Sequence, residues 1–179
     1  MNRSTVQQFP LAPMSLSLLV MTVMLLSFPL GFLALASRAP RGIAVILAGS
    51  ALMMIVLYAL VWLLGRPTRF EVDPLGLRII WPLRSSLLPR ENIVSAAELS
   101  FKELRQRYGY GVRIGAGGLW GGFGLLRTPQ ETFEMWISRT DQVVLVRLKT
   151  GRSVLITPAD PARLVSALMV ESAAPPAAG

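Results

Sequence analysis

Residues 14–36 have the sequence MSLSLLVMTVMLLSFPLGFLALA, and residues 43–64 have the sequence IAVILAGSALMMIVLYALVWLL. No Asp, Glu, Lys or Arg interrupts either stretch. A helix needs roughly 20 apolar residues to cross the hydrocarbon core of a bilayer, and a core helix of a soluble domain is rarely so long and uncharged. The two stretches therefore predict two membrane-spanning helices, and they decide the architecture of the chain.

The link between the two spans, residues 37–42 (SRAPRG), is too short for anything except a tight helical hairpin. Pro29 predicts a bend in the first span, which a bilayer helix tolerates when a neighbour covers the freed carbonyl group. An alternative is a cleaved signal peptide, because residues 34–36 (Ala-Leu-Ala) have the small-x-small form of a cleavage site. Against it, the apolar run exceeds the roughly 7–15 residues of a signal core. Both alternatives place the end of the second span on the inner side.

Arginines are more numerous beside the outer ends of this hairpin, which carry Arg3, Arg66, Arg69 and Arg78. The link carries Arg38 and Arg41. Because basic residues favour the cytoplasmic side, we expect a multi-pass protein of the inner (plasma) membrane whose following domain is cytoplasmic. The chain has no native Cys, so cysteines introduced at Ser37 and Ser153 are suited to reporting the two sides.

The chain has 179 residues, a net charge of +8, and no Cys or His. These absences exclude a disulfide framework, a thiolate nucleophile and a Cys/His metal site. The 10 acidic residues form no paired or motif-spaced set for acid–base catalysis. Two spans without a charged side chain offer no path for an ion or a proton. We therefore expect a protein that is not an enzyme and needs no cofactor.

After the spans the hydrophobic pattern changes from helical to alternating, and residues 66–171 are enough for one domain with its own core. Alternating runs bounded by turn residues predict strands: 69–73, 77–81, 85–99 with a break at Pro89, 133–138, 144–149 and 154–157. Asp160 and Pro161 predict a helix start, followed by an apolar stripe at Leu164, Val165, Leu168 and Met169. Residues 1–13 are predicted to be an N-terminal tail and residues 172–179 a disordered tail.

Three stretches in this order resemble the bacterial pleckstrin-homology-like (PH-like) membrane proteins. They are FEVDPLGLRI (residues 70–79), GAGGLWGGFGLLR (115–127) and GRSVLITPADPARLVSAL (151–168). The resemblance covers roughly residues 66–170. It implies an α+β protein in which a two-helix transmembrane hairpin precedes a PH-like bent antiparallel sheet, or partly open barrel, with one C-terminal helix. It implies no enzymatic activity.

The glycine-rich run at residues 115–127 contains Trp120 and Phe123. It has neither the Gly-Lys-Ser/Thr of a Walker loop nor the spacing of a dinucleotide-binding turn. Two interpretations remain. The glycines form bulges or tight sheet bends and the two aromatic side chains pack in the core, or a flexible loop exposes Trp120 and Phe123 to lipid headgroups or a partner.

Residues 102–113 (KELRQRYGYGVR) combine basic and aromatic side chains. Candidate contact residues in this segment are Arg105, Arg107, Tyr108, Tyr110 and Arg113. Such a segment is typical of a solvated loop or strand edge. It also suits anionic lipid, which attracts each basic residue by about 1 kcal/mol near a membrane surface, and single-stranded nucleic acid. Beside a membrane, lipid is the simpler explanation, and we expect no nucleic acid partner.

The leading hypothesis is a scaffold or accessory subunit that binds a membrane-protein partner or a second copy of itself. The alternative is a module that recognises anionic lipid at the membrane surface. An unrecognised enzyme is the third hypothesis. Binding to protein-free anionic vesicles distinguishes the first two hypotheses, and copurification with a stoichiometric partner after gentle detergent extraction is the most informative experiment.

Overall fold

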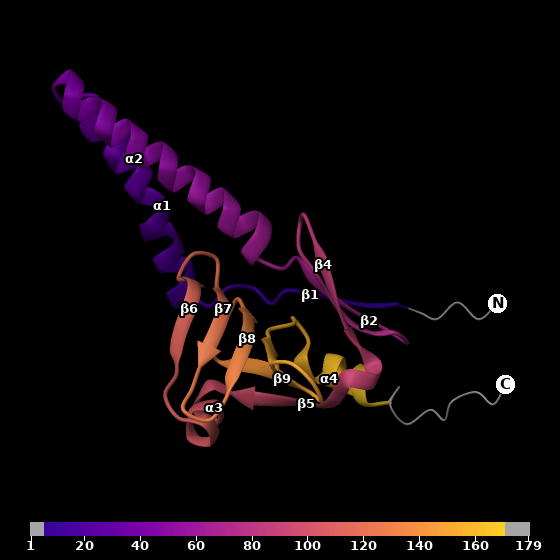
Figure 1. Cartoon of the computed structure of the whole chain (residues 1–179). Coiled ribbons are helices and arrows are strands. Elements are labelled where there is room, and N and C mark those ends of the chain that lie inside the picture. Colours follow the sequence, from indigo (N-terminus) through magenta and orange to yellow (C-terminus); the bar gives the residue numbers. More distant parts are fainter. Residues whose placement is uncertain (1–5, 171–179) are drawn as a thin grey trace.

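The two apolar stretches form a pair of long helices in the computed structural model, which describes residues 6–170 (Figure 1). Helix α1 (Leu16–Ala36) and helix α2 (Arg41–Leu60) pack against each other, and α2 continues as a π-helical turn, η1 (Val61–Gly65). Both helices are long and apolar enough to cross a membrane. The predicted disordered tail, residues 172–179, lies outside the described residues.

The proline in α1 leaves a carbonyl group that α2 satisfies. Pro29 has no N–H, so the Leu25 carbonyl, four residues earlier, has no donor within its own helix. The Tyr58 hydroxyl on α2 donates to Leu25 O at 2.9 Å. This bond confirms the expectation that a neighbouring helix covers the freed group, and it fixes the two helices relative to each other.

Replacing Tyr58 with phenylalanine is expected to destabilise this helix pair by about 1 kcal/mol, a usual value for an interhelical hydrogen bond in an apolar medium. The measurement is denaturation of the full chain in detergent micelles, followed by the circular dichroism of the helices. Tyr110→Phe is the matched control, because Tyr110 is 82% exposed. Equal midpoints for the two variants would contradict a stabilising role for the Tyr58 hydroxyl.

The first sheet has four strands in the order β1-β2-β3-β4. They are β1 (Gln7–Pro10), β2 (Arg69–Asp73), β3 (Gly76–Ile80) and β4 (Ser85–Pro89), each antiparallel to its neighbour. The prediction that residues 1–13 are only a tail is wrong for β1, whose Phe9 is buried in the core. A strand of four residues with one buried side chain has too little alternation to be recognised. Because β1 precedes α1 and β2 follows α2, the helical hairpin is inserted between two paired strands.

The second sheet has six strands in the order β5-β9-β10-β8-β7-β6. They are β5 (Ile93–Ser100), β6 (Val112–Gly117), β7 (Gly122–Arg127), β8 (Thr132–Ile137), β9 (Gln142–Leu148) and β10 (Val154–Ile156). The break predicted at Pro89 separates β4 from β5. The β6–β7 hairpin and the helix α3 (Phe101–Tyr108) before it were not predicted.

Strand β10 departs from the antiparallel sheet that the resemblance implies. It pairs antiparallel with β9 and parallel with β8. The chain reverses direction between β8 and β9 and again before β10, so β10 runs in the direction of β8. A strand inserted between β8 and β9 must therefore be parallel to one of them.

The six-stranded sheet is covered on both faces. One face packs against the four-stranded sheet and the C-terminal helix α4 (Pro161–Val170), and the other packs against α3. In β9, Val144 and Val146 belong to the first core, whereas Val143 and Leu145 belong to the second. The sheets bend but do not close into a barrel. Together with the helices they form an α+β fold.

Helix α4 begins as predicted. The Asp160 carboxylate accepts a hydrogen bond of 3.0 Å from the Arg163 backbone N–H, which is the N-cap interaction. Leu164 and Leu168, one turn apart, are fully buried against strands of both sheets. The predicted apolar stripe therefore covers the space between the sheets.

Candidate functional site

The turn of the β6–β7 hairpin contacts helix α1. Gly118 N–H donates to Gly121 O at 2.9 Å and closes the turn. From α1, the buried Thr22 hydroxyl donates to Gly118 O at 2.9 Å and accepts from the Trp120 N–H at 2.9 Å. Gly118 has a φ of +86°, and a Cβ there would lie 2.3 Å from the sulfur of Met21, so another residue would strain the turn and displace that side chain. The turn is fixed on the helix, which does not fit the interpretation of a flexible loop.

Trp120 and Phe123 differ in their surroundings. Phe123 is 2% exposed and lies beside Gly65, where an added Cβ would lie 3.4 Å from its ring. It is a packing residue, and its burial does not fit exposure on a flexible loop. Trp120 is half-buried and has a φ of +57°, the single positive φ outside glycine in the described part of the chain. Its ring packs edge-on against Trp62 of η1, with centroids 4.9 Å apart.

All four tryptophans of the chain lie where the helices meet the sheets, and we call them the tryptophan junction: Trp62, Trp81, Trp120 and Trp136. Trp81 and Trp136 pack edge-on with centroids 5.0 Å apart. The Trp81 indole N–H donates to Gly65 O, at the end of η1, at 3.1 Å. The Arg66 guanidinium lies 4.4 Å from the Trp62 ring, and that of Arg84 lies 4.3 Å from the Trp81 ring. These contacts hold the end of the helical hairpin against both sheets.

Helix α3 begins with a reciprocal cap that holds it against the second core. The Ser100 hydroxyl accepts from the Glu103 N–H at 3.2 Å, and Glu103 accepts from the Ser100 N–H at 2.8 Å. The bond from the Ser100 N–H lowers the pKa of the Glu103 carboxyl, with a smaller contribution from the Ser100 hydroxyl. Leu104 and Tyr108, at a spacing of four residues, face the sheet and are buried. Arg105 is thereby placed on the outer edge of the helix.

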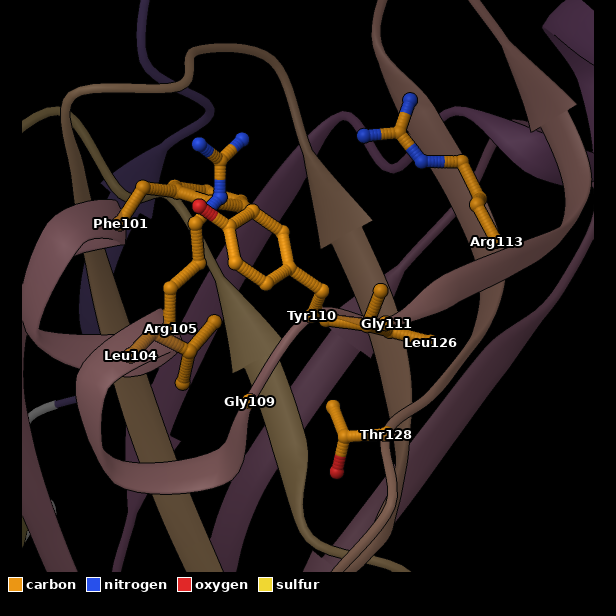
Figure 2. Close-up of a pocket in the computed structure, with 9 residues that line it drawn as sticks. All are labelled: Phe101, Leu104, Arg105, Gly109, Tyr110, Gly111, Arg113, Leu126 and Thr128. Atoms are coloured by element: carbon orange, nitrogen blue, oxygen red, sulfur yellow. The ribbon is translucent and has the colours of Figure 1, made fainter.

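A pocket of about 320 Å³ lies between α3 and the β6–β7 hairpin (Figure 2). Its lining comprises Phe101, Leu104, Arg105, Gly109, Tyr110, Gly111, Arg113, Leu126 and Thr128. Three of the predicted contact residues line this pocket: Arg105, Tyr110 and Arg113. The Arg105 guanidinium lies 5.7 Å from the Tyr110 ring centroid. In Figure 2 the Arg105 guanidinium lies beside the Tyr110 side chain, and that of Arg113 lies farther from it, on the hairpin side of the pocket.

The pocket lining carries positive charge without a neighbouring carboxylate. No Asp or Glu lines it, and no ion pair among residues 6–170 includes Arg105 or Arg113. The Arg113 guanidinium lies over the bare backbone of Gly117 and Gly122, where an added Cβ would approach it to 3.0 Å. Desolvation there lowers the pKa of Arg113, although an arginine stays protonated at neutral pH. The pocket is therefore complementary to an anionic group.

Two predicted contact residues lie outside this pocket. Tyr108 is buried, packs edge-on against Phe133 at 4.9 Å, and accepts a hydrogen bond from Arg147. It is a core residue, so the surface contact predicted for it is wrong. Arg107 is exposed on α3 but does not line the pocket.

Some features of this site left a signal in the sequence and others did not. The series Ser-Phe-Lys-Glu at residues 100–103 is the signature of a capping box. With the four-residue spacing of Leu104 and Tyr108, it could have predicted α3 where a loop or strand edge was expected. Thr22 gave no such signal, because a threonine inside an apolar helix is unremarkable without its partner, 96 residues away.

Within residues 6–170 no group of three or more His, Cys, Asp or Glu side chains is placed to hold a metal ion. No family model, curated protein or solved structure matches this chain. The pocket, the tryptophan junction and the two apolar helices are the features of the chain that bear on its function.

Proposed function

We propose that the chain is a two-span inner-membrane protein whose cytoplasmic PH-like domain acts, without catalysis, as a scaffold or accessory subunit for a membrane-protein partner. Two apolar helices of sufficient length support the anchoring. The PH-like identity is supported by bent sheets covered by one C-terminal helix. The parallel pairing of β8 with β10 and the insertion of the hairpin between β1 and β2 are departures from the pattern that the resemblance implies.

The main support for the partner-binding proposal is the positive charge of the pocket between α3 and the β6–β7 hairpin, which we call the α3 pocket. Arg105 and Arg113 have no carboxylate partner in the described part of the chain, and Tyr110 beside Arg105 is 82% exposed. Exposed aromatic and arginine side chains are typical anchors of protein interfaces. The pocket therefore fits an acidic segment of a partner, with a carboxylate accepting from the guanidinium groups.

The position of the pocket favours a protein over the bilayer itself. The β6–β7 hairpin contacts α1 through its turn, whereas α3 lies at its opposite end (Figure 1). Six residues of strand at about 3.3 Å each separate the two ends by about 20 Å. This is more than two Debye lengths, each about 8 Å at physiological ionic strength. Anionic headgroups near the start of α1 are thus largely screened from Arg105 and Tyr110 at the α3 end of the pocket, whereas the Arg113 guanidinium, over Gly117 and Gly122, lies nearer the turn.

A photo-crosslinking amino acid in place of Tyr110 is expected to capture a membrane protein in intact cells. Combining it with Arg105→Glu and Arg113→Glu is expected to reduce the yield at least about tenfold, since losing about 1.4 kcal/mol of binding free energy already has that effect. The same crosslinker in place of Leu75, which is 63% exposed on the β2–β3 turn, is the control. Capture unaffected by the charge reversal would contradict the proposal. Crosslinks to lipid alone would favour the anionic-lipid alternative, and crosslinks to the chain itself would identify a homo-oligomer.

The cytoplasmic orientation is tested by cysteine labelling. A cysteine in place of Ser37, exposed in the link between α1 and α2, is expected to react with an impermeant thiol reagent on intact cells. Ser153 is unsuitable as the second position because it is buried and its hydroxyl donates to Glu131 at 2.6 Å. Thr140→Cys, exposed between β8 and β9, replaces it and is expected to react only after the membrane is opened. The reverse labelling pattern would place the domain outside.

A further inference from the structure

A second pocket lies at the junction between the helices and the sheets. It has a volume of about 310 Å³, at the lower end of the range for small-ligand sites. One wall is the end of the second apolar helix, with Leu60, Val61, Leu64 and Gly65, and the other is the sheet, with Ala116, Phe123, Gly124 and Trp136. We call it the junction groove. None of the side chains that line it is charged.

The junction groove is continuous with a surface that faces hydrocarbon if the helices span a bilayer. Leu60 and Leu64 both line the groove and remain 48% and 43% exposed. They belong to the last turns of an apolar segment that runs from Arg41 to Gly65. An acyl chain beside this helix can therefore enter the groove without crossing water or polar protein surface.

A cation without a carboxylate partner lies at the rim of the groove. Arg84 donates to Leu64 O at 3.1 Å, and its guanidinium centre lies 5.6 Å from the Trp136 ring centroid. Because Leu64 and Trp136 both line the groove, Arg84 is within reach of its opening. No ion pair among the described residues includes Arg84. A guanidinium beside an apolar groove is complementary to a phosphate attached to an acyl chain.

One residue that lines the groove has a donor without an acceptor. The Trp136 indole N–H is buried and has no hydrogen-bond partner among residues 6–170. A buried donor without a partner costs about 1–3 kcal/mol. A phospholipid carries suitable acceptors in its ester carbonyl and phosphate oxygens, next to its acyl chains. A second protein helix offers few, because its own backbone uses its carbonyl groups.

We propose that the junction groove holds an acyl chain of one membrane phospholipid, whose phosphate is bound by Arg84. The proposal rests on the membrane anchoring proposed above, and it concerns a different site from the α3 pocket. The lipid packs between the helix end and the sheet, so it stabilises the orientation of the domain relative to the hairpin.

The test uses the full chain, purified in detergent with added phosphatidylglycerol and phosphatidylcholine, and native mass spectrometry of the retained lipid. The unsubstituted chain is expected to keep a stoichiometric phospholipid after prolonged detergent exchange. Ala116→Phe fills the groove and is expected to lower retention at least about tenfold, the equivalent of about 1.4 kcal/mol. Ile114→Phe is the matched control, since Ile114 lies on the same strand, is 53% exposed, and does not line the groove.

Arg84→Gln provides an independent variant, because Arg84 is exposed in the turn before β4 and its replacement leaves the core intact. It is expected to lower retention about tenfold. A chain that retains no lipid, or equal retention in Ala116→Phe and Ile114→Phe, would overturn the proposal. A lipid-free dimer that Ala116→Phe disrupts would identify a second copy as the occupant and would also overturn it. Failure of the anchoring itself is distinguishable, because the chain would then fail to sediment with membranes after alkaline washing.

Discussion

Phe123→Ala is expected to lower the free energy of unfolding by about 3–5 kcal/mol, the usual cost of removing a buried phenylalanine. The ring is 2% exposed and contacts the backbone at Gly65 and Gly121, where an added Cβ would lie 3.4 Å and 2.7 Å from its atoms. These glycines carry no side chain that could collapse into the vacated space. The cavity is therefore expected to persist, which puts the cost at the upper end of the range.

Trp120→Ala is expected to cost less, about 1–2 kcal/mol, because Trp120 is half-buried and its contribution is mainly the edge-on contact with Trp62. Denaturation of each variant in detergent micelles, followed by circular dichroism of the strands, measures the difference. Tyr110→Ala, which truncates an aromatic side chain that is 82% exposed, is expected to change stability by at most about 0.5 kcal/mol. Equal losses for Phe123→Ala and Tyr110→Ala would contradict the packing of Phe123.

Leu168→Ala is the second change with a large expected effect, a loss of about 2–5 kcal/mol. Leu168 is fully buried between the two sheets, and its carbonyl accepts a hydrogen bond from Arg90. A domain whose total stability is about 5–15 kcal/mol can lose a large part of it through this one change. The melting midpoint of the full chain is the measurement. Leu75→Ala is the matched control because Leu75 is 63% exposed.

These measurements require the full chain. A fragment that starts after the helices, near Arg66, would lack β1, which pairs with β2 and contributes the buried Phe9 to the first core. Removing β1 would also expose the edge of β2. A destabilised fragment would therefore report the missing strand rather than the substitution. If Leu168→Ala leaves the full chain as stable as Leu75→Ala, helix α4 does not cover the sheets in solution.

The sequence by itself determined the features that depend on neighbouring residues. An uninterrupted apolar run is sufficient to predict a long helix, and both runs form one. Alternation at Phe70 and Val72 predicts β2 because successive side chains of a strand point to opposite faces. Asp160 predicts the start of α4 because its carboxylate caps an N–H only three residues later. Each of these interactions joins residues that are close in the sequence, so a short stretch of sequence is enough to predict it.

Only the tertiary structure decided which distant segments meet. The pairing of β1 with β2 joins Gln7 to Val72 across the whole helical hairpin. The α3 pocket and the tryptophan junction likewise combine side chains from separate elements. The Thr22 hydroxyl bonds to Gly118 and Trp120 across 96 and 98 positions. Contacts over such separations follow from the packing of whole elements, and no local spacing of residues in the sequence encodes them.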